Sequence, residues 1–266
     1  MLSGLSPARR RFVLVVALLL AVVAIVAGVL VLTALRGRLV APVDQSRAGP
    51  VLLVPGYGGS AASLQGLAAR LRAAGRDVTV VQLPDRAQGD LTDQAASVGA
   101  AADAVLGRTG SRSVDVVGYS AGGVVARLWA TEGDGAGRVR RLVMLGSPLH
   151  GTDVARLGTL VSGTCPTACQ QLAPDSPVLA RLDGNSLPSG VIGVSLWSTT
   201  DEVVQPPTSS VEDDLPSPSV QSICAASTVN HGGLPNDRVV QAAILEAVGT
   251  GPIPTWATAD CARLSS

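Results

Sequence analysis

The chain of 266 residues contains no lysine, and all 20 of its basic residues are arginine. This absence excludes lysine Schiff-base chemistry, the lysine of a phosphate-binding loop and a serine–lysine dyad. Histidine is almost as scarce, so His150 and His231 are the two candidates for any mechanism that needs an imidazole base. The formal net charge is zero, and it therefore gives no indication of nucleic acid or another strongly charged partner.

The N-terminus carries a long apolar segment. Arg9, Arg10 and Arg11 precede an uninterrupted apolar run from Phe12 to Leu35, which as a helix would reach about 36 Å. A cleavable signal peptide has a shorter apolar core and a small-residue exit site. We therefore expect a cytoplasmic N-terminus (1–11) and a transmembrane signal anchor (12–35). The remaining chain would lie outside the cytoplasm on a single-pass protein of the cell membrane. Secretion after cleavage is the alternative.

Cysteine is also sparse, with four residues in all. Their spacing lacks paired CxxC units, and no histidine lies near enough in the sequence to complete a zinc site. An even number in an exported domain predicts two disulfides. Of the three possible pairings, we expect Cys165–Cys169 and Cys224–Cys261. The second would close a loop of about 38 residues and add up to about 4 kcal/mol of stability.

Apolar strand-like runs alternate with helix-like segments through the rest of the chain. This alternation predicts an α/β fold with a mostly parallel central sheet and helices on both faces. A linker (36–49) would lead to one catalytic domain (50–249) and a C-terminal tail (250–266) tied by a disulfide. The stretch 149–190 lacks periodicity and is expected to be an insertion, either a small lid or a strapped loop. Strands are expected at 50–54, 77–83, 114–117, 140–145, 191–197 and 220–225, and helices at 64–74, 92–106, 124–131 and 237–248.

A glycine-flanked serine follows the strand 114–117. Ser120 has Gly118 two residues before it and Gly122 two residues after it, and a helix-forming stretch follows at once. A serine exposed at the top of a sheet needs a strand-to-helix turn so tight that side chains at both flanking positions would clash. The pattern predicts a nucleophile elbow around Ser120.

An acid and a histidine follow Ser120 in the chain. Asp201 comes just after the strand 191–197, and His231 lies before the last helix. The order serine, acid, histidine is that of α/β-hydrolases, in which the active groups gather beyond the carboxyl ends of the strands. We expect Asp201 to orient His231, with Glu202 or Asp213 as alternative acids. His150 comes too early in the chain for the base and is interpreted as structural or pocket-lining.

A glycine-rich loop follows the first strand of the domain. In Pro55–Ser60, glycines free the backbone to turn its N–H groups inward. The backbone N–H groups of Tyr57 and Ala121 are expected to form the oxyanion hole for acyl transfer. The loop lacks the lysine of a phosphate-binding loop and the spacing of a dinucleotide fingerprint.

These segments together resemble those of bacterial triacylglycerol lipases and esterases of the α/β-hydrolase superfamily, of the small actinobacterial and Bacillus type. The matching segments are 55–60, 118–127, 147–152, 200–206 and the late His231. The resemblance implies a serine ester hydrolase that forms an acyl-enzyme on Ser120, needs no metal or organic cofactor and acts on a lipid or a small ester. Pro55 departs from the histidine found in many relatives.

Two other functions share these residues. An acyltransferase or a thioesterase would use the same serine, acid and histidine, and only the acceptor or the leaving group would differ. A non-catalytic α/β-hydrolase scaffold would keep the fold alone. The sequence specifies neither the acyl chain nor the oligomeric state.

Overall fold

The computed structural model describes residues 7–39, 42–59, 61–161 and 165–266. The chain divides into two compact units, Met1–Ala41 and Pro42–Ser266, which we describe separately. Of the predicted segments, parts of 1–11, of the linker 36–49 and of the insertion 149–190 lie outside the described residues.

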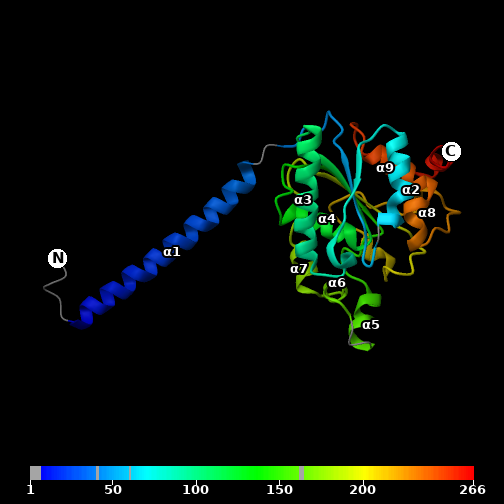
Figure 1. Ribbon diagram of the computed structural model, residues 1–266. Coiled ribbons are helices and arrows are strands. Elements are labelled where there is room, and N and C mark those ends of the chain that lie inside the picture. Colours follow the sequence, from blue (N-terminus) through cyan, green and yellow to red (C-terminus); the bar gives the residue numbers. More distant parts are fainter. Residues whose placement is uncertain (1–6, 40–41, 60, 162–164) are drawn as a thin grey trace. The chain divides into compact units, whose positions relative to one another are not determined.

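The first unit consists of one helix, α1 (Pro7–Leu39) (Figure 1). Its side chains at 14–29 are all exposed. Within the part of the chain that the structure describes, no helix is long and apolar enough to cross a membrane. The predicted transmembrane segment (12–35) is therefore not supported by the structure.

The second unit is built on a five-stranded sheet. The strands lie in the order β2-β1-β3-β4-β5, and every neighbouring pair is parallel. Leu52 pairs with Val116 and Val116 with Leu142, so apolar side chains lie in register across the centre. The predicted parallel sheet is confirmed. Its strands are β1 (Val51–Val54), β2 (Val78–Val80), β3 (Val114–Tyr119), β4 (Val139–Leu145) and β5 (Ile192–Leu196).

Helices cover both faces of this sheet (Figure 1). On one face, α3 (Leu91–Thr109) and α4 (Ala121–Thr131) pack in a core cluster that includes Leu52 of β1. On the other face, α2 (Gln65–Ala73) and α9 (Arg238–Ala247) pack in a cluster that includes Leu53. Because successive side chains of a strand point to opposite faces, a strand that contributes to both cores is mostly apolar along its length.

The insertion 149–190 contains three short helices. They are α5 (Asp153–Val161), α6 (Thr167–Gln171) and α7 (Pro177–Asp183). A disulfide joins Cys165 to Cys169, with the two Cα atoms 5.5 Å apart. In Figure 1, α5 projects from the edge of the domain beyond α6.

The segment 220–225, predicted as a strand, is helical instead. It forms α8 (Val220–Ile223), and the side chain of Ser219 caps its first turn by accepting from the N–H of Ser222 at 3.0 Å. The strand-like contact of this region is one isolated parallel bridge between Trp197 and Ser219. The apolar and β-branched composition of the segment favours a strand, but the cap at Ser219 stabilises the helix instead.

The chain ends in a tail that packs back on the domain. The tail forms α10 (Cys261–Leu264), and a second disulfide joins Cys261 to Cys224 at the end of α8. Both predicted disulfides are thus present in the structure. The described residues also form 3-10 helices: η1 (Ala61–Leu64), η2 (Pro84–Ala87), η3 (Pro207–Ser210), η4 (His231–Asn236) and η5 (Thr258–Asp260).

Buried ion pairs fix the amino end of the sheet, away from the carboxyl ends of the strands. Asp115 on β3 is fully buried, and its Oδ2 accepts from Arg76 at 2.5 Å and from Arg140 at 2.6 Å. Both arginines also donate to the carbonyl of Val248 at the end of α9. Since Asp115 on β3 and Arg140 on β4 pair with each other, both charges are tolerated inside otherwise apolar strands.

Candidate active site

Ser120 stands on the sharp turn between β3 and α4. Its φ of 55° and ψ of −129° lie in a strained region for a residue with a side chain. A Cβ on Gly118 would lie 2.4 Å from the carbonyl oxygen of Gly122, and a Cβ on Gly122 would lie 2.3 Å from that of Val54. Side chains are therefore sterically excluded at both positions, as the sequence predicted for a nucleophile elbow.

His231 lies between Ser120 and Asp201. Its Nε2 is 3.0 Å from Ser120 Oγ, and its Nδ1 is 2.7 Å from Asp201 Oδ2. Asp201 follows β5, and His231 begins η4, so three loops beyond the carboxyl ends of the strands bring the three side chains together. Asp201 is 3% exposed and His231 is 5% exposed, so bulk water hardly competes for these hydrogen bonds.

Asp201 is itself held by the backbone. Its Oδ1 accepts from the N–H groups of Val203 and Val204, both at 2.8 Å, which leaves Oδ2 for the imidazole. The two alternative acids, Glu202 and Asp213, do not take this position. Glu202 does not meet the imidazole; its Oε2 accepts from the backbone N–H of His231 at 3.2 Å. Asp213 lines a different cleft, together with Arg127 and His150.

Tyr119 is a site residue that sequence reasoning missed. Its hydroxyl donates to the carbonyl of His231 at 3.0 Å, and its ring lies 5.2 Å from the imidazole, centroid to centroid. Burial raises the pKa of Tyr119 to about 12, and the nearby carboxylates of Asp201 and Glu202 add to the rise. The phenol therefore stays protonated and keeps its hydrogen bond across the physiological pH range.

The backbone groups expected to form the oxyanion hole flank Ser120. Ala121 is the first residue of α4, where N–H groups have no acceptor within the helix. The loop after β1, the strand that pairs with β3, lies close to Ser120. A Cβ on Gly56 of this loop would lie 2.7 Å from the Cβ of Ser120. Tyr57 follows Gly56 and lines the same cavity as Ser120. The oxyanion role of Tyr57 and Ala121 stays a prediction.

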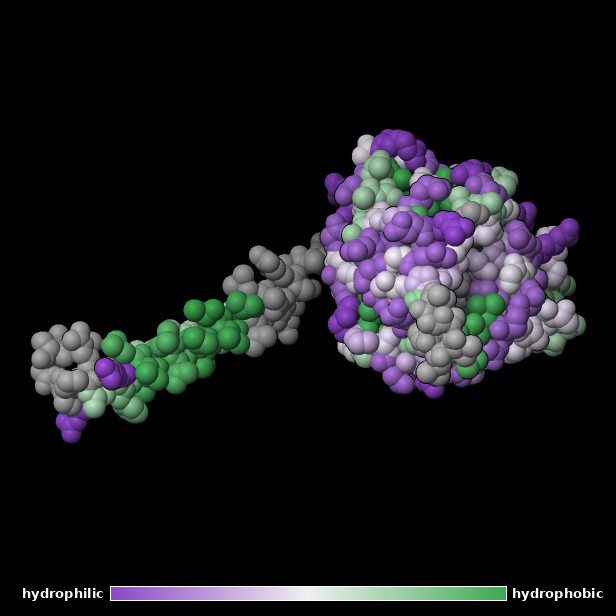
Figure 2. Space-filling view, turned by 60° about the horizontal axis from the view of Figure 1, so that its bottom comes forward, coloured by the Kyte–Doolittle hydropathy of each residue, from purple (hydrophilic) through white to green (hydrophobic). Residues whose placement is uncertain are grey.

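A small apolar cavity opens at Ser120. Its volume is about 120 Å³, and hydrophobic side chains from four segments form most of its lining. Three of the exposed large hydrophobic residues of the second unit line this cavity: Tyr57, Val154 and Val203. In Figure 2 the surface of the second unit is a mixture of hydrophilic and neutral residues with scattered hydrophobic ones. The cavity is lined by Tyr57, Ser120, Pro148, Thr152, Val154, Ala155, Cys169, Leu172, Val203 and Val204.

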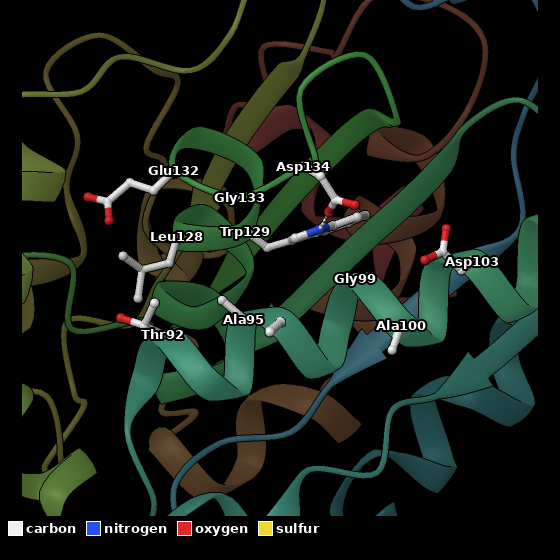
Figure 3. Close-up of a pocket in the computed structure, with 11 residues that line it drawn as sticks. Thr92, Ala95, Gly99, Ala100, Asp103, Leu128, Trp129, Glu132, Gly133 and Asp134 are labelled. Atoms are coloured by element: carbon white, nitrogen blue, oxygen red, sulfur yellow. Dashed lines mark hydrogen bonds between the residues drawn. The ribbon is translucent and has the colours of Figure 1, made fainter.

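A larger hollow of about 490 Å³ lies between α3 and α4. Figure 3 shows Trp129 at its centre, with Asp134 accepting from the indole N–H at 2.6 Å. Asp103 and Asp134 at its rim are both paired with Arg138. Neither Ser120 nor His231 lines this hollow. We therefore do not assign it as the reaction site, although it is larger.

His150 makes structural hydrogen bonds, and neither of them is to Ser120 or Asp201. Its Nδ1 lies 3.0 Å from Asp183 Oδ1, and its Nε2 lies 2.9 Å from the carbonyl oxygen of Val211. Among the described residues, no cluster of histidine, cysteine, aspartate and glutamate could hold a metal ion.

Comparison with known structures identifies the fold. Lipase B of Aspergillus fumigatus superposes with a TM-score of 0.64 at 21% identity, over 80% of this chain and 56% of that protein. Mature lipase BlEst2 of Bacillus licheniformis gives 0.50 at 22% identity over 60% and 70% of the two chains. A gene product of Listeria innocua gives 0.56 at 16% identity over 79% and 97%. The fold is that of the α/β-hydrolases.

The family assignment comes from the sequence of the first part of the domain. No curated protein sequence matches the chain. The family model of palmitoyl protein thioesterases matches residues 50–182, which is half of the chain and includes both the loop after β1 and the elbow at Ser120. The resemblance to small bacterial lipases is not confirmed at the level of the family. The chain belongs to the palmitoyl protein thioesterase family.

Proposed function

We propose that this protein is a serine hydrolase that cleaves esters or thioesters of apolar carboxylic acids through an acyl-enzyme on Ser120. The observation that carries the proposal is the hydrogen-bonded series Ser120–His231–Asp201, with distances of 3.0 and 2.7 Å, beside an apolar cavity. A serine, an imidazole and a carboxylate in this order and geometry form the machinery of nucleophilic acyl transfer.

In the proposed mechanism, Ser120 Oγ attacks the acyl carbon while its proton passes to His231 Nε2. The developing oxyanion accepts from the N–H groups of Tyr57 and Ala121, and Asp201 stabilises the imidazolium. Collapse of the tetrahedral intermediate breaks the bond to the leaving alcohol or thiol, which takes the proton from Nε2. Water, deprotonated by the same nitrogen, then releases the acid and restores Ser120.

The leaving group separates two candidate activities. Family membership favours a thioester, since the family model is named for palmitoyl protein thioesterases. Lipases of the same fold, by their names, favour an oxygen ester or a lipid. The apolar lining fits an acyl chain in either case, and thioester cleavage needs less help with the leaving group because a thiolate is a weaker base than an alkoxide.

A paired assay tests the proposal. Butyryl and octanoyl groups presented both as p-nitrophenyl esters and as thioesters would be hydrolysed by the natural protein. Ser120→Ala should lower kcat on each by on the order of 10⁴–10⁶. Hydrolysis that is unchanged in Ser120→Ala would exclude Ser120 as nucleophile, and the ratio of thioester to ester turnover separates the two candidate activities.

Two further functions are separated by product and labelling experiments. An acyltransferase would give an acyl ester when an alcohol competes with water during turnover. A non-catalytic scaffold would hydrolyse nothing and would leave Ser120 unreactive toward a fluorophosphonate.

We also propose that the domain acts outside the cytoplasm, held at the membrane by the apolar segment 12–35. The two disulfides support an oxidising compartment. The anchor follows from the uninterrupted apolar run in the sequence. Release of the full-length chain from membranes by carbonate washing would contradict the anchor, and detection of a shortened chain in the medium would favour the cleaved alternative.

A further inference from the structure

The helix α5 forms one wall of the cavity at Ser120, and its described side chains are mostly exposed. Val154 and Ala155 line the cavity, whereas Val154 is 46% exposed and Leu157 is 58% exposed. Among the α5 side chains that the structure describes (153–158), that of Ala155 alone is buried. The position of a helix with so little buried surface depends on the contacts made by its ends and its backbone.

The neighbouring helix α6, in contrast, is anchored to the body of the domain. The N–H of Ala168 donates to the carbonyl of Gln88 at 3.1 Å. The side chain of Gln171 accepts from the N–H of Leu91 at 2.8 Å and donates to Asp90 at 2.5 Å, so α6 is bound to the start of α3. The position of α6 relative to the sheet is therefore fixed by three hydrogen bonds.

The disulfide Cys165–Cys169 closes a short loop at the start of this anchored helix and packs against α5. A Cβ on Gly158 of α5 would lie 3.3 Å from Cys169 Sγ and 3.7 Å from Cys165 Sγ, so the sulfur atoms lie against the backbone of α5. Cys169 itself lines the cavity. The side chain of Gln170 also donates to the carbonyl of Cys165 at 2.8 Å, which reinforces the short loop.

We propose that the Cys165–Cys169 disulfide determines the acyl-chain selectivity of this site by bracing α5 as a wall of the cavity. The inference rests on the proposed function, because it assigns the cavity to the acyl group of the substrate. With the brace present, the cavity of about 120 Å³ favours short chains. Without it, α5 can move outward and admit more methylene groups, each of which changes relative turnover substantially in an apolar pocket.

The chain offers a matched control in its second disulfide. Cys224–Cys261 joins α8 to α10, and Figure 1 shows that region apart from α5. We would compare Cys165→Ser/Cys169→Ser with Cys224→Ser/Cys261→Ser in the full-length protein. The readout is the ratio of kcat/KM for octanoyl and butyryl p-nitrophenyl esters. Because both substrates are measured on the same sample, the ratio does not depend on the fraction of active enzyme.

The octanoyl-to-butyryl ratio should rise about fivefold or more in Cys165→Ser/Cys169→Ser and stay within about twofold in the control. An unchanged ratio, or an equal rise in the control, would overturn the inference. Gly158→Val keeps both disulfides while pushing α5 away from the sulfur atoms, and it should raise the ratio in the same direction even if the cysteine variant does not fold. Absence of any ester or thioester hydrolysis by the natural protein would instead refute the proposed function.

Discussion

The two sides of the candidate active site are held in different ways. On the reacting side, Asp201 and His231 are at most 5% exposed and are fixed by hydrogen bonds to backbone and side chains. On the acyl side, α5 presents Val154 and Leu157 to solvent and rests on a disulfide. The proposed reacting groups lie next to the sheet, whereas the proposed acyl wall belongs to an insertion.

This difference separates rate from selectivity. Groups that must meet within a few tenths of an ångström are positioned by rigid elements and a supporting set of hydrogen bonds. A wall that decides which chains fit needs less precision and can lie on a peripheral element. Substitutions on the reacting side should therefore lower kcat for all acyl chains alike, and substitutions around α5 should change their ranking.

Among the residues that support Ser120, the largest effect is expected for Asp201→Asn. The amide cannot stabilise the imidazolium or fix the productive tautomer of His231, so kcat should fall by about 10³–10⁴. The octanoyl-to-butyryl ratio should not change. Asp213→Asn, at the exposed acid that lines the other cleft, should stay within about twofold in the same steady-state assay. A comparable loss in Asp213→Asn would contradict the assignment of Asp201.

The two disulfides should differ in their effect on global stability. Loop-closure entropy predicts a loss of about 4 kcal/mol when the Cys224–Cys261 bond, with a separation of 37 residues, is removed. Removal of Cys165–Cys169, with a separation of 4, should cost about 2 kcal/mol. Urea unfolding of the two double variants measures both values. The reverse order of stability would show that the α5–α6 region contributes more to the global fold than its burial indicates.

Glu202 should act as a positioning residue for His231. Glu202→Ala removes the acceptor for the His231 N–H, and we expect a loss of about tenfold in kcat with little change in KM. Glu202→Gln keeps an acceptor oxygen and should recover most of the activity. If Glu202→Gln is as slow as Glu202→Ala, the carboxylate charge, and not the hydrogen bond, is what matters.

The smallest effect is expected for Tyr119→Phe, which removes one hydrogen bond and keeps the ring. Loss of about 1 kcal/mol of positioning corresponds to about a fivefold fall in kcat.

Burial raises the pKa of Tyr119 to about 12, so the folded state favours the protonated phenol. That stability is fully present below the ordinary tyrosine pKa of about 10 and is lost as the pH rises through about 12. Between these values, the free energy of unfolding should therefore fall more steeply in the natural protein than in Tyr119→Phe. Parallel curves would contradict the origin of the shift.

Much of the sheet could be predicted because its strands are buried on both faces. A run such as Val51–Val54 is apolar throughout, and helical periodicity reappears directly after it. The strand expected at 220–225 was wrong because one side-chain cap at Ser219 outweighs the propensity of a short segment. The short helices α5 and α6 could not be predicted, since the contacts that hold them come from Gln88, Asp90 and a disulfide.

In the candidate site, the structure brings together Ser120, Asp201 and His231, which the sequence singled out from the glycine-flanked serine and the order serine, acid, histidine; their catalytic roles stay a prediction. Tyr119 and Glu202 could not be predicted, because they contact the main chain of His231, and any residue type presents the same main-chain groups. No sequence pattern records such a contact across 112 positions of the chain. The tight elbow was predictable for the opposite reason, since Gly118 and Gly122 are the residues that sterics permit there.

The most direct test of the central claim is mass spectrometry of the protein after reaction with a fluorophosphonate probe and, separately, with an octanoyl thioester trapped at low pH. We predict that both adducts lie on Ser120, and that Asp201→Asn and His231→Ala greatly slow their formation. A natural protein that is folded and carries neither adduct, or that carries them on another residue, would contradict the assignment of Ser120 as the nucleophile.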